Sequence, residues 1–163
     1  MMNNLVLRRL RYALNLREAS MVEMFKLVDV TIKSTAISAL LLREEQEGFT
    51  ECSDLVLAQF LDGMIIKFRG LPDNGKAPTP TPSDIRLNNN LILKKIRVAL
   101  ELREEHLLEI MQIADFKFSK SEMSAFFRKP GSRQYKPCGD QMLRNFLMGL
   151  CEKKRPAEKK TDG

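Results

Sequence analysis

The string NNLVLRRLR at residues 3–11 returns almost unchanged as NNLILKKIR at residues 89–97, and this repetition decides the fold. Sliding the chain along itself by 86 positions pairs residues 3–69 with residues 89–155 without a gap, and 22 of the 67 aligned pairs are identical. The identities extend over the whole length of the unit. We conclude that the chain carries one unit twice, as a tandem duplication.

The duplication divides the chain into two repeats, a linker and a tail. Residues 3–69 form the first helical repeat and residues 89–155 the second. Residues 70–88 between them are rich in proline, which predicts an extended, exposed linker. We expect residues 156–163 to be a disordered tail. Each repeat lies near the lower size limit for an independent hydrophobic core, so we expect the two to pack together.

Each repeat is predicted to contain four helices. In the first helix of each copy the apolar positions fall on one arc at 100° per residue, namely 6, 7, 10, 13 and 14 in one copy and 92, 93, 96, 99 and 100 in the other. Ser119 and Glu122 have the spacing of a capping box, which predicts the start of the third helix of the second copy. Asp54 and Asp140 suit the start of the fourth helices. No segment has the pattern of a strand, so the fold class is all-α.

The first helices also carry apolar residues on the side opposite the core arc. These residues are Leu5 and Tyr12 in the first copy and Leu91 and Val98 in the second. A second apolar stripe is expected to be covered. We therefore predict that the copies pack through their first helices with pseudo-two-fold symmetry, and that these four residues form the repeat interface.

The repeat pattern resembles that of the YehS-like bacterial proteins, a family of unknown function (domain-of-unknown-function family 1456) whose members carry this unit twice. The most specific strings are the two Asn-Asn-Leu helix starts and the run SAFFRKPG at residues 124–131. The resemblance covers nearly the whole chain. It implies a cytoplasmic, tandem, helical protein, but it implies no established activity, cofactor or site residue.

Composition excludes several classes of protein. No segment reaches the roughly 18 apolar residues of a membrane span, and Arg8 and Arg9 interrupt the N-terminal apolar run before it is long enough for a signal peptide. The three cysteines, Cys52, Cys138 and Cys151, are far apart and odd in number, which is typical of neither a disulfide framework nor a metal site. We therefore expect a cytoplasmic location, no metal and no membrane partner.

The net charge of +6 is confined to one copy, and this is the strongest functional signal in the sequence. The first repeat has nine basic and nine acidic residues, whereas the second has fourteen basic and eight acidic ones. The contrast is sharpest after the third helix: residues 43–51 contain four glutamates, while residues 129–137 contain three cations and no acid. A merely solvated face would not concentrate the whole excess on one copy.

The second and third helices of the second copy resemble a helix-turn-helix, although the turn between them is longer than usual and lacks glycine. On a continuous third helix, Lys120, Ser124 and Arg128 would share one outward stripe at i, i+4 and i+8, from which they could reach phosphates or base edges. The predicted nucleic-acid-binding residues, for DNA or RNA, are Lys117, Lys120, Ser121, Ser124, Arg128, Lys129, Arg133 and Lys136.

Two alternatives stay open beside nucleic-acid binding. One is a protein-interaction module, in which the acidic and basic copies meet other proteins or a second copy of the chain. The other is an enzyme, but the single histidine, His106, lies among glutamates, and no phosphate-binding loop or catalytic set is present. We expect no catalytic residue and no cofactor. Phe116, Phe118 and Tyr135 lie among the cations, where aromatic rings either stack on bases or belong to the core.

Overall fold

The computed structural model describes residues 2–71 and 80–156, and this part of the chain forms eight helices and no strand. The prediction of an all-α fold with four helices in each repeat is confirmed. The helices are α1 (Met2–Leu14), α2 (Glu18–Lys26), α3 (Ser34–Leu41), α4 (Asp54–Arg69), α5 (Asn89–Leu100), α6 (Glu104–Ile113), α7 (Lys120–Ala125) and α8 (Asp140–Lys154).

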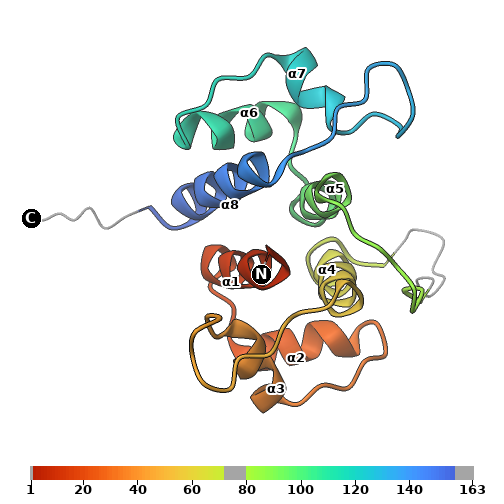
Figure 1. Cartoon of the computed structure of the whole chain (residues 1–163), viewed down its shortest axis with the longest axis vertical. Helices are drawn as coiled ribbons and strands as arrows, with labels where there is room; N and C mark the ends of the chain where they lie inside the picture. Colours follow the sequence, from red (N-terminus) through yellow and green to blue (C-terminus); the bar gives the residue numbers. More distant parts are fainter. Residues whose placement is uncertain (1, 72–79, 157–163) are drawn as a thin grey trace, which may run out of the picture.

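The first and fourth helices of both repeats form the centre of the molecule. α1 packs against α8 and α4 against α5, and smaller contacts join α1 to α4 and α5 to α8. These four helices lie between the pair α2–α3 on one side and the pair α6–α7 on the other (Figure 1). The two halves therefore repeat one arrangement about an approximate two-fold axis, as predicted.

One hydrophobic core runs through both repeats. The predicted arcs of the first helices are buried at Val6, Leu7 and Leu10 in α1 and at their counterparts in α5. They join a single cluster with residues of all the other helices. Neither repeat has to close a core of its own, which agrees with the small size of each unit.

Contrary to the expectation that the first helices pair with each other, each one packs against the fourth helix of the other repeat. Of the four predicted interface residues, Leu5, Leu91 and Val98 are half-buried. Tyr12 is 47% exposed, and the guanidinium carbon of Arg155 lies 4.5 Å from its ring centroid. The second apolar stripe is thus partly covered, with an arginine over its outer end.

Two aligned glycines let the outer helices approach the central ones. A Cβ on Gly63 of α4 would overlap the carbonyl oxygen of Met24 in α2, and a Cβ on Gly149 of α8 would overlap that of Ile110 in α6. Backbones this close leave no room for a side chain. The pair of glycines therefore fixes how α2 and α6 sit on the centre of the molecule.

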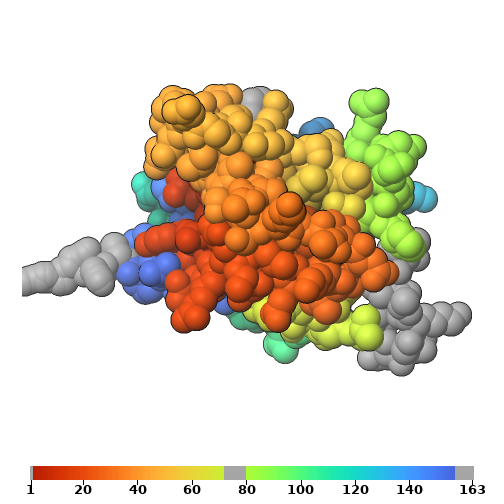
Figure 2. All heavy atoms as spheres, turned by 90° about the horizontal axis from the view of Figure 1, so that it is seen from below, coloured from red at the N-terminus to blue at the C-terminus, as the bar shows by residue number. Residues whose placement is uncertain are grey.

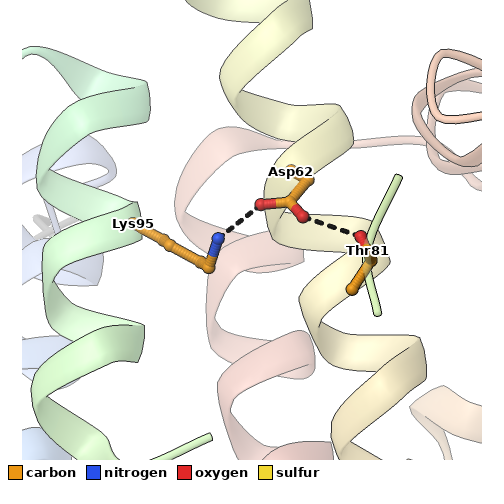
Figure 3. Close-up of polar contacts among 3 residues, drawn as sticks. All are labelled: Asp62, Thr81 and Lys95. Atoms are coloured by element: carbon orange, nitrogen blue, oxygen red, sulfur yellow. Dashed lines mark hydrogen bonds and ion pairs between the residues drawn. The ribbon is translucent and has the colours of Figure 1, made fainter. Parts of the chain in front are cut away.

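A half-buried polar contact joins the repeats at the seam between α4 and α5 (Figure 3). The Asp62 carboxylate accepts a hydrogen bond from Lys95 Nζ at 2.6 Å and another from Thr81 Oγ1 at 2.8 Å. The equivalent positions at the seam between α1 and α8 are Met148 and Arg9, which cannot form this ion pair. The two seams are therefore alike in shape and different in chemistry.

Part of the predicted linker lies against the first repeat. After residue 80 the chain makes a turn closed by the hydrogen bond from the Ile85 N–H to the Pro82 carbonyl, and the Leu87 N–H donates to Asp54 Oδ2 at 3.0 Å. Figure 2 shows this segment in light green beside α4 in yellow. Residues 72–79 of the linker and 157–163 of the predicted tail lie outside the described residues.

Candidate nucleic-acid interface

The basic loop of the second repeat, residues 126–138, is held at both ends by one buried asparagine. Asn90 Nδ2 donates to the carbonyl oxygens of Phe126 and Lys136, each at 2.9 Å, and Asn90 Oδ1 accepts from the Cys138 N–H at 2.8 Å. All polar atoms of the Asn90 amide group are thus engaged by backbone groups. The loop is therefore fixed to the start of α5, although it contains no regular secondary structure.

The preceding residue, Asn89, ties the same loop to α8. Its Nδ2 donates to the Cys138 carbonyl at 3.0 Å and to Asp140 Oδ1 at 2.7 Å. Asp140 is the first residue of α8, where a carboxylate favours the positive end of the helix dipole. The Asn-Asn string is therefore a clamp between the first helix and the segment before the fourth.

The first repeat contains the same clamp. Asn4 Nδ2 donates to the carbonyl oxygens of Leu40 and Thr50, and its Oδ1 accepts from the Cys52 N–H, all at 2.9 Å. Asn3 likewise reaches the residues before and within the start of α4. The clamp is thus a property of the fold, whereas the charge of the clamped loop differs between the copies.

The predicted capping box at the start of α7 is confirmed. Ser119 Oγ accepts from the Glu122 N–H at 3.1 Å, and the Ser119 N–H donates to Glu122 Oε1 at 2.8 Å. The hydrogen bond from the Ser119 backbone N–H to the carboxylate, and after it the interaction with the Ser119 side chain, lower the pKa of Glu122. The carboxylate is thus held at the start of the helix, where the charge of Lys136 lowers its pKa by a smaller effect.

The expected continuous stripe on the third helix is wrong beyond Ala125, where α7 ends. The next two residues are held by short-range hydrogen bonds from Phe126 N to Met123 O and from Phe127 N to Ser124 O. The Phe126 carbonyl is engaged by the clamp, and Pro130 disfavours helical backbone at the residue before it. Arg128 therefore lies in a turn after α7 and not at i+8 of a helix.

Seven of the eight predicted nucleic-acid-binding residues are exposed, and Ser124 is half-buried. The Ser124 hydroxyl donates to the Ser121 carbonyl at 3.2 Å, so this hydroxyl is engaged within its own helix. The six cations are Lys117, Lys120, Arg128, Lys129, Arg133 and Lys136, and none forms an ion pair with another described residue.

Aromatic rings pack against residues of the basic loop and against the start of the second repeat. The Lys136 ammonium lies 6.0 Å from the centroid of the Phe126 ring, and the Arg97 guanidinium lies 4.6 Å from that of Phe127. Phe118 packs edge-on against Phe126, with their ring centroids 6.1 Å apart. Tyr135 is half-buried. These rings are structural, whereas Phe116 is 42% exposed and belongs to the surface.

The groups considered for catalysis are two buried thiols and one histidine at the start of a helix. Burial, with a smaller contribution from a neighbouring aspartate, raises the pKa of Cys52 to about 12 and that of Cys138 to about 11. His106 Nδ1 accepts the Arg103 N–H at 2.9 Å at the start of α6. In the described ranges no three histidine, cysteine or acidic residues gather as metal ligands would.

Sequence reasoning missed the Asn-Asn clamps, the glycine contacts and the Asp62 contact between the repeats. Only the clamp left a usable signal, because an asparagine pair recurs at two helix starts.

None of the helices that the structure describes is long and apolar enough to cross a membrane.

Comparison with known proteins places both repeats in one family. The family model described as "Protein of unknown function (DUF1456)" matches residues 3–70 and again residues 89–155. The chain is 37% identical over 150 residues to "Uncharacterized protein YehS" of Escherichia coli (strain K12), covering 92% of this chain and 94% of that protein. No solved structure matches. With both repeats matched and a relative aligned over nearly its full length, the chain belongs to the DUF1456 family.

Proposed function

We propose that this protein is a non-enzymatic nucleic-acid-binding protein that acts through its second repeat. The observation that carries the proposal is the set of six exposed cations without an ion-pair partner among the described residues, on α7 and the segments on either side of it. Lysine and arginine displace the counterions of phosphates, and this supplies most of the affinity of a nucleic-acid interface.

The rigidity of the basic loop supports the proposal. The Asn90 clamp holds both ends of the loop that carries Arg128, Lys129 and Arg133, and the capping box orders the start of α7. A surface that is already ordered loses less conformational entropy on binding than a flexible tail with the same charge.

We also propose a cytoplasmic location, because the three cysteines are free thiols and a reducing compartment keeps thiols in that state.

The test is a fluorescence-anisotropy titration of labelled DNA and RNA, single-stranded and duplex, at two salt concentrations. The affinity is expected to fall steeply with salt, and Arg128→Glu with Lys129→Glu is expected to weaken it and to reduce the salt slope by about two. The matched control is Lys26→Glu with Lys33→Glu, which changes the net charge equally at exposed positions of the first repeat.

A protein-interaction module is the second candidate, and the observation that favours it is the acidic loop of the first repeat. Glu45, Glu47 and Glu51 are exposed there, at positions equivalent to the basic loop of the second repeat. If no nucleic acid binds at low ionic strength, the nucleic-acid proposal is refuted and this candidate replaces it. Equal losses in the two double variants would instead assign the binding to net charge alone.

A further inference from the structure

The helix that would read a DNA duplex is short. α7 has six residues, which at 1.5 Å per residue corresponds to about 9 Å. Proteins that read duplex DNA commonly lay a longer helix along the major groove, with several side chains on one continuous face. Here only Lys120 among the six cations lies on α7, and Arg128, Lys129, Arg133 and Lys136 follow it in the loop before α8. This arrangement suits a flexible strand better than a groove.

An aromatic ring stands at the beginning of this basic stretch. Phe116 is 42% exposed, and exposed Lys117 follows it. By contrast, Phe118 is half-buried and packs against Phe126. The position aligned with Phe116 in the first repeat is Val30, a smaller side chain that is half-buried. The turn therefore does not require an exposed phenyl ring for its own packing.

The backbone beneath Phe116 is fixed. Asp115 has the left-handed conformation, with φ of 70°, and its N–H donates to the Gln112 carbonyl at 2.8 Å. The Phe116 N–H donates to the Met111 carbonyl at 2.9 Å. An exposed ring on a fixed turn is a platform on which a base can stack, and such stacking tolerates any base because every base has a π face.

The segments that carry these residues follow one another along the edge of the molecule. In Figure 1 the chain leaves α6, passes through α7 and continues into the loop before α8, on the side of the second repeat away from the first. Along the sequence of these segments Phe116 comes first, then Lys117 and Lys120, then the cations of the loop. A phosphate backbone could follow the cations with a base over the ring at one end.

We infer that the ligand of this surface is a single-stranded nucleic acid, and that Phe116 stacks on one of its bases. The inference rests on the proposed function and narrows it from nucleic acid in general to one strand. Ribose and deoxyribose strands share the phosphates and base faces on which it depends. RNA and DNA are therefore separate arms of the test.

The first measurement compares single-stranded and duplex oligonucleotides of one sequence, as DNA and as RNA, with the full chain at low salt. Single strands are expected to bind at least about tenfold more tightly. Phe116→Ala is expected to weaken single-strand binding about tenfold, the usual range for the loss of one stacked base. The matched control is Phe68→Ala in α4, because Phe68 has the same 42% exposure in the first repeat.

A second measurement observes the stacking directly. The chain contains no tryptophan, so Phe116→Trp introduces a single indole whose fluorescence reports only on this position. Quenching of that fluorescence on addition of single-stranded oligonucleotide, with affinity kept, is expected from a base stacked on the ring. Far-UV circular dichroism of each variant is expected to match the parent, since an exposed side chain supports no core contact.

The outcomes separate the inference from the proposal beneath it. If duplex binds as tightly as single strand, or if Phe116→Ala behaves like Phe68→Ala, the inference is overturned while nucleic-acid binding stands. If neither form binds at low salt, the proposed function fails and the inference fails with it. A preference for single-stranded RNA, DNA or both supports the inference and identifies the sugar.

Discussion

Replacing Asn90 with alanine tests whether the clamp orders the basic loop. The substitution removes three hydrogen bonds and leaves the carbonyls of Phe126 and Lys136 and the N–H of Cys138 without their partner. A buried polar group that loses its partner costs about 1–3 kcal/mol. The Lys136 carbonyl is only part-buried, so water can reach it and we take the lower value for each group. The free energy of unfolding is therefore expected to fall by about 3 kcal/mol.

Urea unfolding followed by far-UV circular dichroism measures this free energy. For a chain of this size the same loss corresponds to a fall in Tm of about 6–12 °C. Asn4→Ala removes the equivalent three hydrogen bonds from the first repeat and is expected to cost about as much. Only Asn90→Ala is expected also to weaken nucleic-acid binding, measured at a temperature where both variants remain folded.

Two results would refute this reasoning. A loss below about 0.5 kcal/mol in both variants would mean that water replaces the amide at little cost, since surface-like substitutions have effects of that size. Equal losses of nucleic-acid affinity in Asn4→Ala and Asn90→Ala would mean that stability, and not the order of the basic loop, governs binding.

Three further predictions concern packing, the seam and the thiols. Gly149→Ala is expected to lower the free energy of unfolding by about 3 kcal/mol, because the added Cβ overlaps the α6 backbone. Gly139→Ala places its Cβ in open space and is expected to change that free energy by less than about 0.5 kcal/mol. Urea unfolding of both variants distinguishes the two effects. A double-mutant cycle of Asp62→Asn and Lys95→Met is expected to give a coupling of about 1 kcal/mol, and additive effects would show that the ion pair contributes nothing. Burial raises the pKa of Cys52 from 9.0 to about 12. The contribution of this thiol to the free energy of unfolding is therefore present below about pH 9 and is lost as the pH rises toward 12. Cys52→Ala should flatten that decline in the free energy of unfolding, and an unchanged pH profile would contradict the prediction.

The periodic and repeated parts of the fold could be predicted from the sequence. The duplication, the number of helices and the buried arcs of α1 and α5 follow from identities and from the 3.6-residue period. The capping box of α7 is equally local, because Ser119 and Glu122 are three residues apart. Pro130 disfavours helical backbone at Lys129, but nothing local indicates that α7 already ends at Ala125.

Contacts between distant residues could not be predicted in the same way. The Asn90 clamp spans 36 to 48 residues, and nothing local indicates which backbone groups it will meet. Gly149 has the same local pattern whether it packs closely or lies in solvent. The pairing of α1 with α8 depends on which apolar stripes fit each other. The sequence of α1 alone does not indicate which helix will cover its apolar stripe.

The chemical difference between the two seams has a consequence for how this protein can specialise. In a symmetric dimer of single repeats, each substitution would appear twice, so one face could not become acidic while its twin became basic. Joining both copies in one polypeptide removes that constraint, and the Asp62–Lys95 contact exists at only one seam for the same reason. On the proposed function only the second repeat of each chain binds, so titration to saturation should give one oligonucleotide per polypeptide.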